Sequence, residues 1–264
     1  MDSRPDGYAS AVQPPATTAI HTDAKGLVAG EATIATRDRE ISAYFAKPQG
    51  GERHPVVLLA HEIWSVHEYF KDLCRRLAKL GYLAVAVDLY ARQGDVSGLS
   101  IEEIRKVVAR VPDEQVMSDL DATAKWAMAN GGDPHRLGIT GFCWGGRITW
   151  LYCAHNAQLK AGVAWYGPVE RPATELQPRH PVDLAAALKC PVLGLYGAED
   201  AGIPNDTVEH MRAALESAGQ PSQVILFPGM PHAFHADYRP SYRKEAAEEG
   251  WRLMLDWFSR HGVA

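Results

Sequence analysis

The chain has 264 residues, of which 46% are hydrophobic and 22% charged, a composition typical of a globular protein that buries one large core. Its formal net charge is −5, and no lysine- or arginine-rich run occurs, so nucleic acid is an unexpected partner. The longest apolar runs have the length of strands and are too short to span a membrane. Four scattered cysteines disfavour a disulfide framework or a zinc site and favour a reducing compartment.

The N-terminal residues 1–26 are rich in Ala, Pro, Thr and Asp, which predicts a flexible tail. They lack the apolar core of an intact secretory signal, although a leader cleaved upstream would leave no trace. We therefore expect a cytoplasmic protein whose residues 27–264 form a single domain.

Hydrophobic patterning predicts alternating strands and helices in that domain. Alternating residues at 31–36 and 41–45 indicate an antiparallel hairpin at a sheet edge, and the apolar run at 54–62 indicates a central strand. Further strands are predicted at 82–89, 136–142, 159–167, 190–197 and 222–227, and helices at 66–80, 101–111, 114–129, 145–154, 207–218 and 243–260. This alternation predicts an α/β fold with right-handed crossovers, a mainly parallel sheet of about eight strands, and helices on both faces.

One strand-to-helix turn contains a candidate nucleophile. An apolar run from Leu137 breaks into Gly-x-Cys-x-Gly-Gly around Cys143 and then into a helical pattern. Such a turn holds one side chain at a tight bend, where a Cβ on a flanking residue would collide with neighbouring backbone. The following helix N-terminus favours thiolate. A buried structural cysteine is the alternative interpretation of Cys143.

Two later loops supply the partners that a nucleophilic thiol requires. Asp200 and His232 each follow directly after a predicted strand, so both are expected at the same edge of the sheet as Cys143. Nucleophile, acid and histidine, in this order along the chain, are typical of the α/β-hydrolase triad. A solvated turn aspartate and a loop histidine remain the alternatives for these two residues.

The sequence resembles the dienelactone hydrolase family of α/β-hydrolases, the carboxymethylenebutenolidases, over roughly residues 27–262. The resemblance implies that Cys143 is the nucleophile, His232 the base and Asp200 the acid that orients it. The matching pieces are His61-Glu62-Ile63-Trp64, Asp88-Leu89-Tyr90-Ala91-Arg92-Gln93, Gly141-Phe142-Cys143-Trp144-Gly145-Gly146-Arg147, Trp165-Tyr166-Gly167, Gly197-Ala198-Glu199-Asp200 and Pro231-His232-Ala233-Phe234.

The resemblance also implies roles for the loop after the first central strand. Glu62 is expected to contact the resting thiol, and the backbone N–H groups of Ile63 and Trp144 to form the oxyanion hole. A solvated carboxylate at a strand end is the alternative for Glu62. The spacing of His61 and His67 does not match a His-Glu-x-x-His zinc motif, so no metal is expected, and no cofactor is implied.

Substrate recognition is expected in the loop that follows residues 82–89. Arg92 matches a family arginine that pairs with the substrate carboxylate, with a structural salt bridge as the alternative, and Tyr90 is a second candidate substrate contact. The family's other carboxylate-binding arginine, three positions after the base, is replaced by His235. We expect His235 to bind a carboxylate weakly unless it is protonated at low pH. Tyr238 and Arg239 follow closely and could compensate.

The leading hypothesis is a cofactor-free hydrolase that opens a small ester or lactone through a thioester acyl-enzyme. The alternatives are a general carboxylesterase or thioesterase without lactone preference, and a non-catalytic small-molecule-binding protein on the same scaffold. A thiol redox role is a further alternative. The expected partner is a small-molecule substrate, with no membrane partner, and the expected state is a monomer or weak homo-oligomer.

Overall fold

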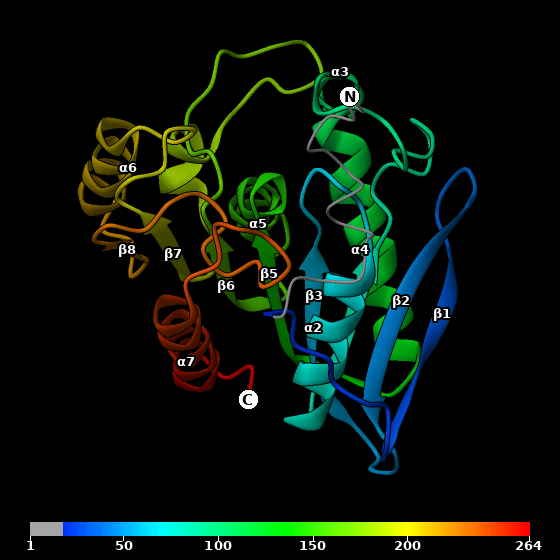
Figure 1. Cartoon of the computed structure of the whole chain (residues 1–264). Helices are drawn as coiled ribbons and strands as arrows, with labels where there is room; N and C mark the ends of the chain where they lie inside the picture. The colour runs from blue at the N-terminus through cyan, green and yellow to red at the C-terminus, as the bar shows by residue number, and fades with distance from the viewer. Residues whose placement is uncertain (1–17) are drawn as a thin grey trace.

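The computed structural model describes residues 18–264 of the chain. An eight-stranded sheet forms the centre of this part of the chain (Figure 1). The strands β1 and β2 form an antiparallel hairpin at one edge, β2 pairs antiparallel with β4, and the remaining pairs are parallel, which confirms the predicted sheet. The spatial order is β1-β2-β4-β3-β5-β6-β7-β8. The strands are β1 Leu27–Ala35, β2 Glu40–Pro48, β3 His54–Ala60, β4 Leu83–Val87, β5 Gly132–Phe142, β6 Leu159–Trp165, β7 Val192–Gly197 and β8 Gln223–Phe227.

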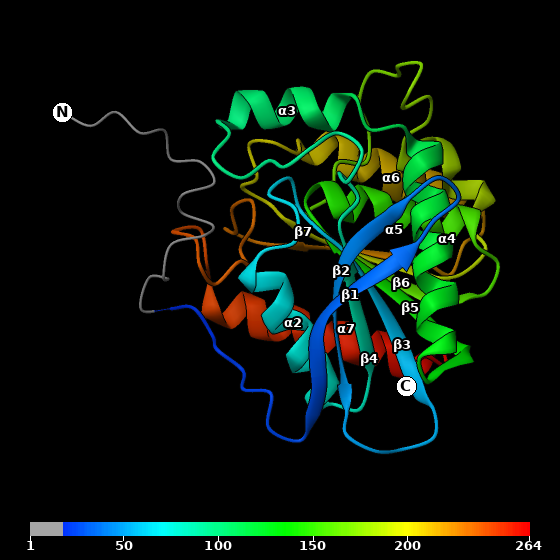
Figure 2. The same cartoon turned by 90° about the vertical axis from the view of Figure 1, so that its right-hand side faces the viewer.

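Helices cover both faces of this sheet, as predicted. Figures 1 and 2 show α2 and α7 on one face and α4, α5 and α6 on the other, with α3 across one end of the molecule. Within residues 18–264, none of these helices is both long and apolar enough to cross a membrane. The helices are α2 Glu68–Lys79, α3 Ile101–Ala109, α4 Asp113–Ala129, α5 Trp144–His155, α6 Asn205–Ser217 and α7 Lys244–Arg260, and the short 3-10 helix η1 spans Pro181–Ala187.

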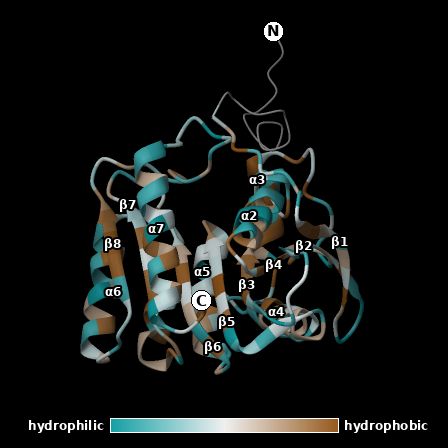
Figure 3. Ribbon diagram, turned by 90° about the horizontal axis from the view of Figure 1, so that it is seen from below, coloured by the Kyte–Doolittle hydropathy of each residue, from teal (hydrophilic) through white to brown (hydrophobic). Residues whose placement is uncertain are grey.

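Burial on both faces explains why the sequences of the central strands are continuous apolar runs. Every residue of β4 is completely buried, and hydrophobic residues concentrate along strands such as β3 and β8 (Figure 3). Two features depart from the prediction. The strand β5 begins at Gly132, because that residue pairs with His54, and η1 forms directly after a proline-punctuated stretch that gave no helical pattern.

The segment 18–25, which we call the N-terminal strap, is tied to distant parts of the chain. The backbone N–H of Thr22 donates to the buried carboxylate of Asp72 at 2.5 Å, and the hydroxyl of Thr18 donates to the backbone carbonyl of Asp237 at 2.7 Å. These contacts differ from the flexible tail predicted for this part of residues 1–26. The remainder of that prediction, residues 1–17, lies outside the described residues.

Candidate active site

Cys143 occupies the bend between β5 and α5 in a conformation that few side chains adopt. Its φ is +54°, and its backbone N–H donates to the carbonyl of Trp165 at 2.9 Å, which fixes the bend against β6. A Cβ at Gly145 would lie 2.1 Å from the carbonyl oxygen of Ala60, and one at Gly141 would lie 2.1 Å from the carbonyl oxygen of Gly145. Glycine is required at both positions because the opposing atoms belong to the backbone.

Asp200 and His232, from the loops after β7 and β8, form a hydrogen-bonded pair that faces Cys143. Asp200 is buried, with one carboxylate oxygen 2.6 Å from His232 Nδ1 and the other accepting the N–H of Gly202 at 2.8 Å. Burial alone would lower the pKa of His232, but the Cys143 sulfur and the Asp200 carboxylate together raise it to about 10. The fold thus brings the three predicted triad residues together, with the imidazole favoured as imidazolium.

The two backbone N–H groups predicted to form the oxyanion hole are available as donors. Trp144 is the first residue of α5, so its N–H has no acceptor within the helix, and the N–H of Ile63 makes no hydrogen bond within residues 18–264. Buried His61 fixes the loop that contains Ile63. Its Nε2 accepts the backbone N–H of Leu89 at 3.1 Å, so Nδ1 carries the proton that it donates to the carbonyl of Glu62 at 2.7 Å.

Glu62 is buried and contacts groups that the sequence analysis did not assign to it. Its carboxylate lies 3.0 Å from His67 Nε2 and accepts the hydroxyl of Tyr238, and within residues 18–264 no hydrogen bond joins it to Cys143. Burial raises the pKa of Glu62, but His67 and the nearby charge of Arg239 lower it below its usual value. The carboxylate therefore hydrogen-bonds to an imidazole and a phenol, and its contact with the resting thiol stays a prediction.

Comparison with known proteins places this geometry in a family. Residues 41–262 match the model of the dienelactone hydrolase family. The chain belongs to the dienelactone hydrolase family. Two curated relatives, from Methylorubrum extorquens and Escherichia coli K12, carry the name "Putative carboxymethylenebutenolidase". They are 57% identical over 262 residues, covering 98% of this chain and 90% of the relative, and 49% identical over 259 residues, covering 97% and 96%.

A crystal structure of a "Putative Dienelactone Hydrolase" from Klebsiella pneumoniae superposes with a TM-score of 0.87 at 53% identity, covering 88% of this chain and 98% of that one. These similarities confirm the predicted α/β-hydrolase fold and the prediction that the chain is a hydrolase. The predicted substrate pocket of this dienelactone hydrolase family member can therefore be compared residue by residue with the structure.

Arg92, the predicted carboxylate anchor, is occupied by carboxylates of its own chain. Its guanidinium contacts buried Asp119 at 2.6 and 2.9 Å, and it also donates to Asp38 and Thr36. This arrangement corresponds to the structural salt bridge that was the alternative interpretation. Arg92 lines a cavity of about 320 Å³ that no triad residue reaches; its other lining residues are Arg37, Asp38, Pro112, Glu114, Gln115 and Ser118.

His235 does not form the second half of a carboxylate pocket. It is buried, its Nδ1 lies 2.6 Å from the hydroxyl of Tyr69, and its ring stacks on Trp251 with 5.7 Å between centroids. Burial, together with the charge of Arg76, holds the pKa of His235 well below its usual value. Both effects oppose the protonation at low pH on which the expected carboxylate binding by His235 depends.

Tyr90 remains a candidate substrate contact. Its side chain is 1% exposed, and its ring packs against His61 and Trp144 with centroid separations of 4.6 and 5.0 Å. Its hydroxyl has no hydrogen-bond partner among the described residues. Burial, with a contribution from Cys143, raises the pKa of Tyr90 well above its usual value, so the phenol stays a neutral hydrogen-bond donor.

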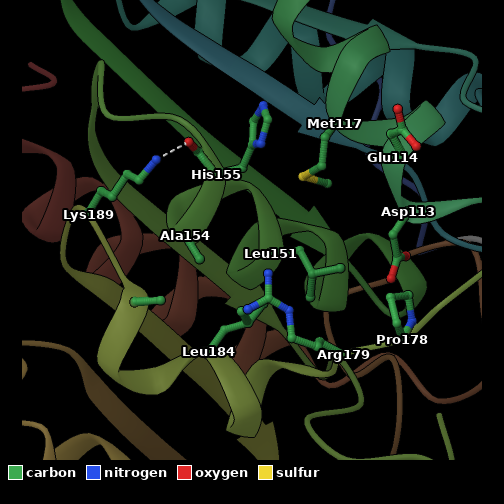
Figure 4. A pocket seen from close by; sticks show the side chains of 11 residues that line it. Asp113, Glu114, Met117, Leu151, Ala154, His155, Pro178, Arg179, Leu184 and Lys189 are labelled. Atoms are coloured by element: carbon green, nitrogen blue, oxygen red, sulfur yellow. Dashed lines mark hydrogen bonds between the residues drawn. The ribbon is translucent and has the colours of Figure 1, made fainter.

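A separate cavity of about 310 Å³ lies between α4, α5 and η1 (Figure 4). Two of the charged groups on its wall have partners within the chain: Asp113 pairs with Arg147, and Lys189 donates to the backbone carbonyl of His155. None of the predicted site residues lines it. Among residues 18–264, no group of three or more His, Cys, Asp or Glu side chains is placed to hold a metal ion.

Proposed function

We propose that this chain hydrolyses a small ester or lactone through a thioester on Cys143, with His232 as the acid–base group and Asp200 as its orienting partner. The observation that carries the proposal is the Asp200–His232 pair facing a cysteine held at positive φ at the start of α5. An imidazolium and a helix N-terminus both favour the thiolate form of a cysteine. The resting nucleophile is therefore an ion pair with His232.

Acylation begins when Cys143 Sγ attacks the carbonyl carbon of the substrate. The carbonyl oxygen takes up the negative charge, and the N–H groups of Ile63 and Trp144 stabilise it by hydrogen bonds. The C–O bond then breaks, and His232 gives its proton to the leaving oxygen. With a lactone, the released alcohol stays attached to the acyl group.

Deacylation returns the enzyme to its starting state. Neutral His232 removes a proton from water, the resulting hydroxide attacks the thioester carbonyl, and the C–S bond breaks to release the acid. Sulfur leaves as thiolate, and the proton remains on His232. Asp200 holds Nδ1–H throughout, so that Nε2 faces the reacting atoms.

The proposal is tested by trapping the acyl-enzyme. A p-nitrophenyl ester should release a burst of one nitrophenol per chain, and acid quenching should leave a protein heavier by one acyl group. Iodoacetamide should alkylate Cys143 alone, because Cys74, Cys153 and Cys190 are buried.

The Cys143→Ala variant should keep its fold and lose about six powers of ten in kcat, as when a triad nucleophile is removed. Normal turnover by that variant, or an acyl adduct on another residue, contradicts the proposal. A panel that pairs small lactones with open-chain esters of the same acid distinguishes a lactonase from a general carboxylesterase or thioesterase.

A further inference from the structure

Asp237 is a buried residue that joins three separate parts of the chain. It follows His232 by five positions (237 minus 232), in the segment between β8 and α7. Its carboxylate accepts a hydrogen bond from the Arg76 guanidinium of α2. From the N-terminal strap, the N–H of Ile20 donates to the same carboxylate at 3.4 Å, and the hydroxyl of Thr18 donates to the Asp237 carbonyl at 2.7 Å. Helix, strap and segment therefore meet at this one residue.

The Asp237 carboxylate belongs to a cluster of two carboxylates and two guanidiniums. Asp72, which is also buried, accepts Arg76 Nε at 2.5 Å and Arg75 Nη2 at 3.3 Å. The strap lies beside α2 and completes the cluster, because the N–H of Thr22 donates to Asp72 and its carbonyl accepts Arg75 Nε at 2.7 Å (Figure 1). Burial raises the pKa of Asp237, and Arg76 and a strap N–H oppose that rise. The donors of α2 and of the strap thus favour the charged form of this carboxylate.

The loop that contains Ile63 is tied to Asp237 from two directions. This loop runs directly into α2, so Arg76 joins Asp237 to the helix that continues the loop. On the other side, the adjacent Tyr238 donates its hydroxyl to Glu62, which precedes Ile63 in the same loop. A shift of Asp237 relative to α2 would therefore also disturb the contact at Glu62.

The segment between β8 and α7 contains the proposed base as well. His232 and Asp237 lie in a run of turns held by short-range hydrogen bonds: the N–H of Ala236 donates to Ala233 O at 3.0 Å, and the N–H of Arg239 donates to Ala236 O at 3.0 Å. Because these bonds join residues of the same segment, a shift at one of its turns is passed to the next. A misplacement of about 1 Å at a reacting group can lower a rate about a hundredfold.

We propose that Asp237 is a positioning residue: held by Arg76 and the N-terminal strap, it fixes the proposed base and the proposed oxyanion donors at the separation that acylation requires. This inference rests on the proposed hydrolysis at Cys143. Asp237 acts through the groups that it places, since its own carboxylate is bound to Arg76 and the strap. The strap thereby affects the rate of hydrolysis as well as the stability of the fold.

The test measures the rate of the nitrophenol burst from p-nitrophenyl acetate, which reports acylation. In full-length Asp237→Asn, which keeps the shape of the side chain but removes the charge opposite Arg76, the burst rate at saturating ester should fall about ten- to a hundredfold. The amplitude should stay at one nitrophenol per chain and KM within about twofold, because the nucleophile and the binding site are retained. Arg76→Gln should slow the burst similarly, and the double variant should lose little more, because the two residues form one contact.

Asp119→Asn is the matched control, because it removes the same charge from another buried carboxylate, the partner of Arg92. It should destabilise the protein but leave the burst rate within about twofold of the wild type, which separates positioning from a general loss of stability. An Asp237→Asn variant that acylates at the wild-type rate, or an Asp119→Asn variant that slows equally, overturns the inference. The proposed function fails differently, since the wild-type chain itself would then give no burst.

Milder variants keep the inference testable if either Asn variant does not fold. Thr18→Val removes only the strap hydroxyl that donates to the Asp237 carbonyl, and the burst should slow about two- to tenfold, the value of one hydrogen bond. Thr18→Ser restores the donor and should recover the wild-type rate. Thr33→Val, at an exposed position in β1, is the control and should leave the rate unchanged. Equal rates in Thr18→Val and Thr33→Val overturn the inference.

Discussion

The imidazole of His232 lies between a carboxylate and a sulfur, and both stabilise its protonated form. Because its pKa is raised to about 10, the imidazolium persists across neutral pH and is lost only as the pH approaches that value. The Asp200 hydrogen bond supplies part of this shift. Removing the carboxylate should therefore bring the loss of the proton to lower pH and leave the imidazole free to adopt the wrong tautomer.

We expect Asp200→Asn to lower kcat by about four powers of ten, in line with the cost of a misoriented triad histidine. The alkaline limb of the kcat/KM profile should begin near pH 10 in the wild type and at lower pH in the variant. The measurement is hydrolysis of a neutral p-nitrophenyl ester between pH 6 and 11, a range that extends about four units below and about one unit above that pKa. Asp206→Asn, at an exposed position in α6, is the control. An alkaline limb at the same pH in all three proteins would show that Asp200 does not set the pKa of His232.

At the scale of elements, the bend between β5 and α5 depends on close backbone packing against β3 and β6. The ideal Cβ of an alanine at position 145 lies 2.1 Å from Ala60 O, and a carbonyl at the end of a central strand cannot rotate away as a side chain can. The bend can accommodate alanine there only by moving the helix off the sheet. This movement would also displace Cys143 from His232.

We therefore expect Gly145→Ala to lower the free energy of unfolding by about 3 kcal/mol, toward the upper part of the range for overpacked sites. Hydrolysis should be lost even where the variant remains folded. Gly30→Ala in β1 is the control, since no atom lies within 4 Å of its Cβ, and its effect should be near 0.5 kcal/mol or less. Urea denaturation followed by tryptophan fluorescence measures both. Equal stability of the two variants would contradict this explanation of the bend between β5 and α5.

At the scale of the whole molecule, sequence patterns predicted the sheet and the proximity of Cys143, Asp200 and His232, because both follow from local signals. A continuous apolar run reports burial on both faces, and the ends of parallel strands meet at one edge whatever the details of packing. The partners of polar side chains gave no such signal. Asp38 and Asp119 lie 54 and 27 residues from Arg92, and Tyr238 lies 176 residues from Glu62. Only the assembled fold shows that carboxylates of the chain neutralise Arg92.

The N-terminal strap also joins segments that lie far apart in the sequence, and its contribution to the free energy of unfolding can be measured. Thr22→Pro removes the N–H that Asp72 accepts, which should reduce the free energy of unfolding by about 1 to 3 kcal/mol because a buried carboxylate loses a donor. Thr22→Ala keeps that N–H and should match the wild type within about 0.5 kcal/mol. The comparison uses urea denaturation of full-length proteins. Two variants of equal stability would mean that the strap contributes nothing through this hydrogen bond.

Asp237, which the strap contacts through Thr18, is synthesised 219 residues after Thr18. A ribosome that adds about 5 to 20 residues per second takes on the order of 10 to 45 seconds to synthesise this interval. During that time the strap lacks its contact at Asp237, and for part of it Cys143 lacks His232, its proposed base. A translation product that stops before His232 contains Cys143 but not its proposed base. Under the proposed mechanism, hydrolysis therefore requires that synthesis has passed His232.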